Sequence, residues 1–127
     1  MVKKMDINIP EIIEEVTLAF FAYEKALAEN NVERINQFFW EDSKTIRYGP
    51  NGTLIGYVAL SEFRRNRKIT GVRRTLKNTS ILAFGRNFAV ANTEAEVDNM
   101  PGTTQQSQTW IRTQKGWKIV SAHVSHI

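Results

Sequence analysis

Apolar residues recur at helical spacing over the first part of the chain. Between about Ile9 and Glu29 one face carries Ile9, Ile12, Ile13, Val16, Ala19, Phe20, Tyr23 and Leu27. This spacing predicts an amphipathic helix, and Asn8 and Pro10 suit its start. Tyr23 lies within the apolar stripe, so we expect its ring to point into the protein.

Two further helices are predicted downstream. A short one runs from about Val32 to Phe39 and is followed directly by Trp40. Another spans about Tyr57 to Lys68. The residues of this third helix expected to face inward are Val58, Leu60, Phe63 and Arg67.

The rest of the chain shows strand patterns. Ser43 to Tyr48 is predicted as a strand with Arg47 on the face opposite Tyr48, and Gly49 to Gly52 is a strong turn. Four long strands then follow, separated by short turns, at about Arg73–Phe84, Phe88–Asp98, Thr103–Thr113 and Gly116–His126. Helices followed by antiparallel hairpins predict an α+β domain, a bent sheet covered by helices.

The last strand has an unusual pattern on its two faces. One face carries Trp117, Ile119, Ser121, His123 and Ser125, and the other carries Lys118, Val120, Ala122, Val124 and His126. We interpret this as a central strand covered on both sides. Its His/Ser end is expected to face a cavity, and its Val/Ala face a further layer such as a second subunit. Long strands that enclose a space must curve, so a β-bulge or two is expected.

Composition narrows the class of protein. The 127 residues, 42% of them hydrophobic and 24% charged, predict one globular domain over residues 1–127. No apolar run is long enough for a membrane span, and the first residues do not resemble a signal peptide, so a cytoplasmic location is expected. There is no cysteine, and the two histidines point to opposite strand faces, so neither a metal site nor a cofactor is expected.

The net charge of +4 arises largely from a basic run between Arg64 and Lys77. Three interpretations are open: a solvated helix end and strand start, a nucleic-acid surface, or a positive field that draws small anions to a pocket. We favour the first. No aromatic residues interleave with the run, so nucleic-acid binding is not expected.

Several sequence blocks, in order, resemble the AtzH-like branch of the nuclear-transport-factor-2-like (SnoaL-like) superfamily, which includes an oxalurate-catabolism protein. The blocks are Met5-Asp-Ile-Asn-Ile-Pro, Phe21-Ala-Tyr-Glu-Lys-Ala-Leu, Phe39-Trp-Glu-Asp, Thr45-Ile-Arg-Tyr-Gly, Phe84-Gly-Arg-Asn-Phe-Ala, Gln106-Ser-Gln-Thr-Trp and Ala122-His-Val-Ser. The resemblance implies a cone-shaped fold. Three N-terminal helices would pack on a strongly curved, mainly antiparallel sheet (a cystatin-like roll), with a pocket on the concave side. It also implies a homodimer through the convex sheet face.

Candidate site residues come from separate elements that this fold would bring to one pocket. Tyr23 and Arg47 are the catalytic candidates. Those for substrate binding are Trp40, Gln106, Gln108, His123 and Ser125. A buried arginine needs a carboxylate partner or a bound anion, and a buried phenol is a positioned proton donor or acceptor. Structural roles remain open alternatives: a core tyrosine, a surface ion pair of Arg47 with Asp42 or Glu41, a hydrogen-bonded sheet face for the glutamines, and a core histidine.

The resemblance implies a role in the breakdown of small nitrogen-rich compounds, alongside amidases. We expect metal-independent hydrolysis or decarboxylation of a carboxylated urea- or oxalurate-like anion. The alternative is a non-catalytic domain that binds a metabolite or stabilises an amidase. A steroid-isomerase-like mechanism is not favoured, because no aspartate is placed in an apolar pocket.

Overall fold

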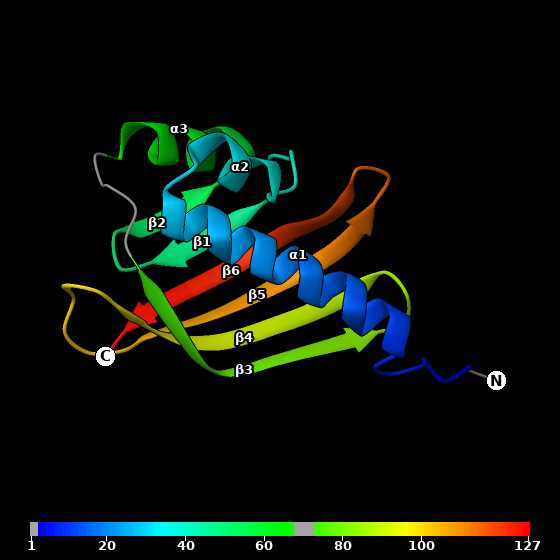
Figure 1. Ribbon diagram of the computed structural model, residues 1–127. Coiled ribbons are helices and arrows are strands. Elements are labelled where there is room, and N and C mark those ends of the chain that lie inside the picture. The colour runs from blue at the N-terminus through cyan, green and yellow to red at the C-terminus, as the bar shows by residue number, and fades with distance from the viewer. Residues whose placement is uncertain (1–2, 68–72) are drawn as a thin grey trace.

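The computed structural model describes residues 3–67 and 73–127. Three helices pack on one curved, mostly antiparallel sheet with the strand order β2-β1-β6-β5-β4-β3 (Figure 1). The elements are α1 Pro10–Glu29, α2 Val32–Gln37, β1 Ile46–Gly49, β2 Gly52–Ile55, α3 Tyr57–Asn66, β3 Arg74–Phe84, β4 Phe88–Val97, β5 Thr104–Thr113 and β6 Gly116–His126. The predicted α+β fold is therefore confirmed.

The helices agree with the hydrophobic pattern except at α3. Helix α1 lies across the concave face of the sheet (Figure 1) and buries Ile12, Val16, Phe20 and Tyr23. In α3 the prediction for Val58 is wrong, because this side chain is 67% exposed. The helix instead buries Leu60 and Arg64, and the predicted end at Lys68 lies outside the described residues.

Strand β2 was not predicted. The turn after Gly49 closes a two-stranded antiparallel hairpin of β1 and β2. Strand β1 also pairs in parallel with β6, which sets Arg47 beside Ala122. Because β1 and β6 are parallel and far apart in the sequence, no turn connects them and no local signal marks their pairing. Strand β2 is too short and too exposed to show an alternating pattern.

A β-bulge in β6 reverses the predicted faces of its second half. Trp110 pairs with Ile119, whereas the preceding Thr109 pairs with Ser121, so Val120 is the extra residue. One inserted residue exchanges the two faces for everything that follows. His123 and Ser125 therefore lie on the convex face, and Val124 faces the cavity. The prediction that the His/Ser end looks inward is wrong.

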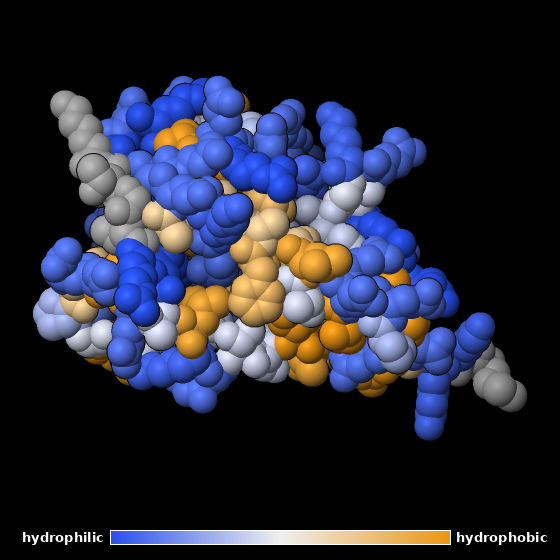
Figure 2. Space-filling model, in the orientation of Figure 1, coloured by the Kyte–Doolittle hydropathy of each residue, from blue (hydrophilic) through white to orange (hydrophobic). Residues whose placement is uncertain are grey.

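The core lies between α1 and the concave side of the sheet. Its largest fully buried side chains include Trp110, Phe20 and Ile119. Tyr23 makes edge-to-face contacts with Phe38, Phe39 and Trp110, with ring centroids 5.8, 5.9 and 6.2 Å away. In the space-filling view polar side chains cover most of the surface, and apolar ones emerge mainly toward the middle and the N-terminal side (Figure 2).

The convex face does not carry the Val/Ala surface that we expected to meet a second subunit. Ala122 is buried and Val124 lines the cavity. The same face exposes Phe88 and Tyr48, at 54% and 45%. A homodimer across this face stays a prediction. None of the helices in the described residues is long and apolar enough to cross a membrane.

Candidate active site

A cavity of about 230 Å³ lies between the helices and the concave side of the sheet. Among the residues lining it are Tyr23, Arg47, Arg64, Arg67, Arg74, Met100, Thr104, Gln106, Val124 and His126. Other hollows among the described residues are larger and more open to solvent. Two of about 490 Å³ lie on the convex face and beside Trp40. We take the smaller cavity as the candidate site because buried charged groups gather only there within the described part of the chain.

Arg47 enters the cavity from β1, where strand alternation turns it away from exposed Tyr48. It is 7% exposed, and its guanidinium packs directly over Gly49. A Cβ at position 49 would lie 2.7 Å from Arg47 Nη1. A glycine at this position therefore leaves the space that the guanidinium occupies.

Two more guanidinium groups enter from the end of α3. Arg64 is 3% exposed, and Arg67 follows it by three residues, so both reach the same side of the helix. Together with Arg47 they surround the Phe63 ring, at 5.6 Å for Arg47, 5.9 Å for Arg64 and 5.7 Å for Arg67 from its centroid. The aromatic face offers a favourable surface for cations, but it does not neutralise them.

These three arginines lack a carboxylate partner among the described residues. The ion pairs of the structure involve Arg74, Lys77, Arg86 and Arg112. The Nε atoms of Arg64 and Arg67 are buried without a hydrogen-bond partner in that part of the chain. Buried unpaired donors of this kind cost free energy unless a ligand satisfies them.

Burial, and after it the crowding of cations, lowers the pKa values of Arg47 and Arg67. Burial, followed by the charge of Arg64, lowers the pKa of Arg47. Burial, followed by the charges of Arg64 and Arg47, lowers the pKa of Arg67 to about 10. Both guanidinium groups remain protonated at neutral pH, and a bound anion would relieve their repulsion.

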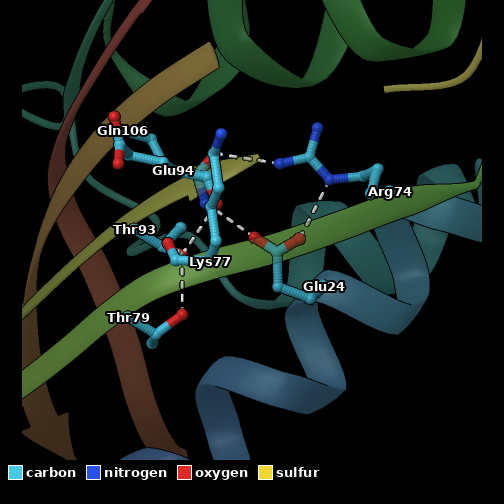
Figure 3. A network of polar contacts seen from close by, with 7 residues as sticks. All are labelled: Glu24, Arg74, Lys77, Thr79, Thr93, Glu94 and Gln106. Carbon is cyan, nitrogen blue, oxygen red and sulfur yellow. Dashed lines mark hydrogen bonds and ion pairs between the residues drawn. The ribbon is translucent and has the colours of Figure 1, made fainter. Parts of the chain in front are cut away.

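Arg74 is the exception, because a carboxylate from α1 neutralises it. Its Nε lies 2.9 Å from Glu24 Oε2, and its Nη2 donates to Gln106 Oε1 at 3.1 Å. Gln106 Nε2 in turn donates to Glu24 Oε1 at 2.6 Å. Figure 3 shows this ring of contacts, with Glu24 rising from α1 toward Arg74 on β3.

His126 and Thr104 also line the cavity, and they tie the β4–β5 loop to the end of β6. His126 Nε2 lies 2.6 Å from the carbonyl oxygen of Pro101, so this nitrogen carries the proton and donates. The other ring nitrogen, Nδ1, lies 3.3 Å from the Thr104 hydroxyl oxygen. The His126 imidazole thus holds the loop that carries Met100 against the cavity.

The structure brings Tyr23, Arg47 and Gln106 together, and it places the other candidates elsewhere. Gln108 is on the concave face, but its Oε1 accepts from Trp110 Nε1 at 3.0 Å and it does not line the cavity. Trp40 borders the separate hollow beside Lys118. His123 and Ser125 line the convex face, where the bulge at Val120 puts them.

Sequence reasoning missed Glu24, Arg64, Arg74, Thr104 and His126. Of these, Arg64 and Arg74 belong to the basic run that we assigned mainly to solvent. That interpretation holds for Arg65 and Lys77, which are exposed, and it is wrong for the buried Arg64. Arg67 follows Arg64 by three residues and Arg74 follows Arg67 by seven. This gave a weak signal, because the second spacing spans a helix end and a strand start. The third interpretation, a positive field that draws small anions to a pocket, stays a prediction.

Within the described residues, no group of three or more His, Asp or Glu side chains is placed to hold a metal ion. The side chains that line the cavity offer guanidinium groups, one phenol, an amide and an imidazole. Such a set can bind a carboxylate and hold or move a proton at the Tyr23 oxygen.

Comparisons with known proteins agree with this architecture. The AtzH-like family profile matches residues 5–127. A DUF3225-family protein from Pectobacterium atrosepticum shares 41% identity over 96% of this chain and 95% of its own, with a TM-score of 0.92. A cystatin-like fold protein from Burkholderia xenovorans shares 40% identity over 97% of both chains, with a TM-score of 0.90.

More distant structures share the fold alone. One is a nuclear-transport-factor-2-like superfamily protein from Salmonella enterica, with 23% identity over 91% of both chains and a TM-score of 0.71. No curated protein matches the chain. The chain belongs to the AtzH-like family and shares the fold of nuclear-transport-factor-2-like proteins.

Proposed function

We propose that the cavity binds a small carboxylated amide, of the carboxylated-urea or oxalurate type, and hydrolyses or decarboxylates it without a metal. The observation that carries the proposal is a group of three guanidiniums, from Arg47, Arg64 and Arg67, that have no carboxylate partner within residues 3–67 and 73–127. The volume of about 230 Å³ suits a ligand of this size.

Charge balance favours an anion over a neutral ligand. Arg47 and Arg64 are almost completely buried. Burying their positive charges without a counter-charge costs free energy, and a bound anion offsets that penalty. With Arg74 already paired to Glu24, a net positive charge remains in the cavity. A planar carboxylate matches the fork of a guanidinium and accepts two parallel hydrogen bonds.

Differential binding sets which part of the substrate each group holds. A guanidinium bound to a carboxylate that leaves as CO₂ would stabilise the reactant more than the transition state. In a decarboxylation Arg47 therefore holds a carboxylate that stays, as in a urea with two carboxylates, and the departing carboxylate lies away from it. The C–N bond breaks, its electron pair remains on nitrogen, and nitrogen takes the Tyr23 proton. Water then returns a proton to the phenolate.

Hydrolysis uses the same groups in a different order. Arg47 polarises the scissile carbonyl and water adds to its carbon. The C–N bond then breaks as Tyr23 passes its proton to the leaving nitrogen, and a proton of the added water returns to the Tyr23 oxygen. Oriented donors of this kind lower a barrier by about 3 kcal/mol each. In both reactions Tyr23 is the proton carrier, and its ring is held by edge-to-face contacts with Phe38, Phe39 and Trp110.

The test combines calorimetry with assays for ammonia and CO₂ release. Wild-type protein is titrated with oxalurate and with carboxylated ureas, and the Tyr23→Phe and Arg47→Lys variants follow. We expect Tyr23→Phe to bind but to lose turnover, and Arg47→Lys to lose both. Folded variants with unchanged turnover would refute these roles. Binding without any product would favour a non-catalytic domain.

A further inference from the structure

We propose that Glu24 is a positioning residue: it fixes the orientation of the Gln106 amide and so makes the cavity prefer anions that carry an amide N–H. The proposal rests on the proposed function of the cavity as an anion site, and it adds which neutral group beside the carboxylate is recognised. Glu24 itself is not among the residues that line the cavity.

The geometry consists of a closed ring of three side chains from three elements. Glu24 from α1 accepts from Arg74 of β3 at 2.9 Å and from Gln106 of β5 at 2.6 Å. Arg74 closes the ring through its 3.1 Å bond to Gln106 Oε1 (Figure 3). Glu24 and Gln106 are 6% and 7% exposed, so water does not compete freely for these bonds.

The ring allows only one orientation of the amide. An ionised carboxylate only accepts hydrogen bonds, and a guanidinium only donates them. Gln106 must therefore turn Nε2 toward Glu24 and Oε1 toward Arg74. Flipping the amide would set N–H against guanidinium and oxygen against carboxylate, with the loss of two charge-assisted bonds.

With its orientation fixed, the Gln106 amide keeps one acceptor and one donor free for further hydrogen bonds, both in fixed directions. The second lone pair of Gln106 Oε1 accepts, and the second N–H of Nε2 donates. Gln106 lines the cavity wall together with Arg47, Arg64 and Arg67, so these valences lie beside the anion site. A ligand with a carboxylate next to an amide can satisfy both kinds of group at once, whereas a ligand with a methyl group in place of the amide nitrogen cannot.

The alternative is a purely structural role, because the ring also ties α1 to the sheet. In that case removing the Glu24 charge would lower stability and alter the affinity for all anions alike. A ratio of affinities for two ligands of equal charge and shape separates the two cases. Oxamate and pyruvate are such a pair, since they differ by an NH₂ group in place of CH₃.

Isothermal titration of the full chain with both ligands tests the proposal. We expect the wild type to bind oxamate about tenfold more tightly than pyruvate. In Glu24→Gln the new side chain offers both a donor and an acceptor, so Gln106 can adopt either orientation. The affinity ratio should then fall to about one. Arg74→Lys keeps a cation beside Glu24 but loses the Nη2 bond to Gln106, and it should lower the ratio as well.

Glu96→Gln is the matched control. It removes the same charge from an exposed ion pair with Lys77 and should leave the ratio unchanged. A wild-type ratio near one, or a ratio unchanged in Glu24→Gln or, if that variant does not fold, in Arg74→Lys, overturns the proposal. Failure of the wild type to bind either anion would instead refute the anion site itself, so the two failures are distinct.

Discussion

Replacing Arg67 with methionine is expected to stabilise the ligand-free protein while it weakens anion binding. Methionine keeps most of the length and apolar volume of the side chain and removes the charge. Because Arg67 lies beside Arg47 and Arg64 without a carboxylate partner in the described chain, its charge is unfavourable until a ligand arrives.

The magnitude follows from the pKa of Arg67, which is lowered from 12.5 to about 10. A difference of about 2.5 corresponds to roughly 3.4 kcal/mol, at 1.36 kcal/mol for each pKa unit. Arg67 is only half-buried, and solvent screening reduces this to about 1–2 kcal/mol. Below pH 10 the residue is charged in both the folded and unfolded states, so the full penalty acts at neutral pH.

Thermal unfolding with and without oxamate measures both effects. For a domain of this size we expect the melting temperature of Arg67→Met to rise by about 3–8 °C without ligand. The further rise that oxamate gives the wild type should shrink, because stabilisation by a ligand depends on its affinity. Arg65→Met is the matched control, because Arg65 lies two residues before Arg67, is exposed, and its replacement removes the same charge.

The reasoning would be refuted if Arg67→Met were less stable than the wild type while Arg65→Met was unchanged. It would also be refuted if oxamate stabilised Arg67→Met as much as the wild type. The first result would mean that Arg67 has a favourable partner, and the second that the anion lies elsewhere.

Three further predictions follow from the same cavity. Gly49→Ala should unfold at nearly the wild-type temperature but bind oxamate about tenfold more weakly by calorimetry, because its Cβ would displace the Arg47 guanidinium; unchanged affinity would contradict this contact. Oxamate affinity should be constant from pH 7 to 9 and decline above pH 10, as Arg67 loses its proton; a decline centred below pH 8 would show that another group controls binding. His123→Ala should bind oxamate with an affinity within about twofold of the wild type, since His123 lies on the convex face. A larger loss would indicate that His123 faces the cavity after all.

The sequence predicted the fold well because its signals are local. The helical stripe of α1 and the turns between the long strands each depend on residues close together in the chain. Arg47 and Tyr23 were found for the same reason, since the strand and helix periods alone set their direction. The parallel pairing of β1 with β6 has no such local signal, and it was not predicted.

The site was predicted less well because its geometry depends on non-local detail. A single extra residue at Val120 moved His123 and Ser125 to the outer face, and no sequence feature marks where a bulge falls. Arg64 and Arg74 are charged residues in a basic run, for which exposure is the usual outcome. Their burial is explained only by the cavity, together with Glu24 from a helix 50 residues before Arg74.

A crystal structure of the protein grown with oxamate tests the central claim most directly. The account predicts a planar ligand in the cavity, with its carboxylate on the guanidinium of Arg47 and its amide beside Gln106. Density for water alone at a saturating concentration, or a ligand bound only on the convex face, would contradict it.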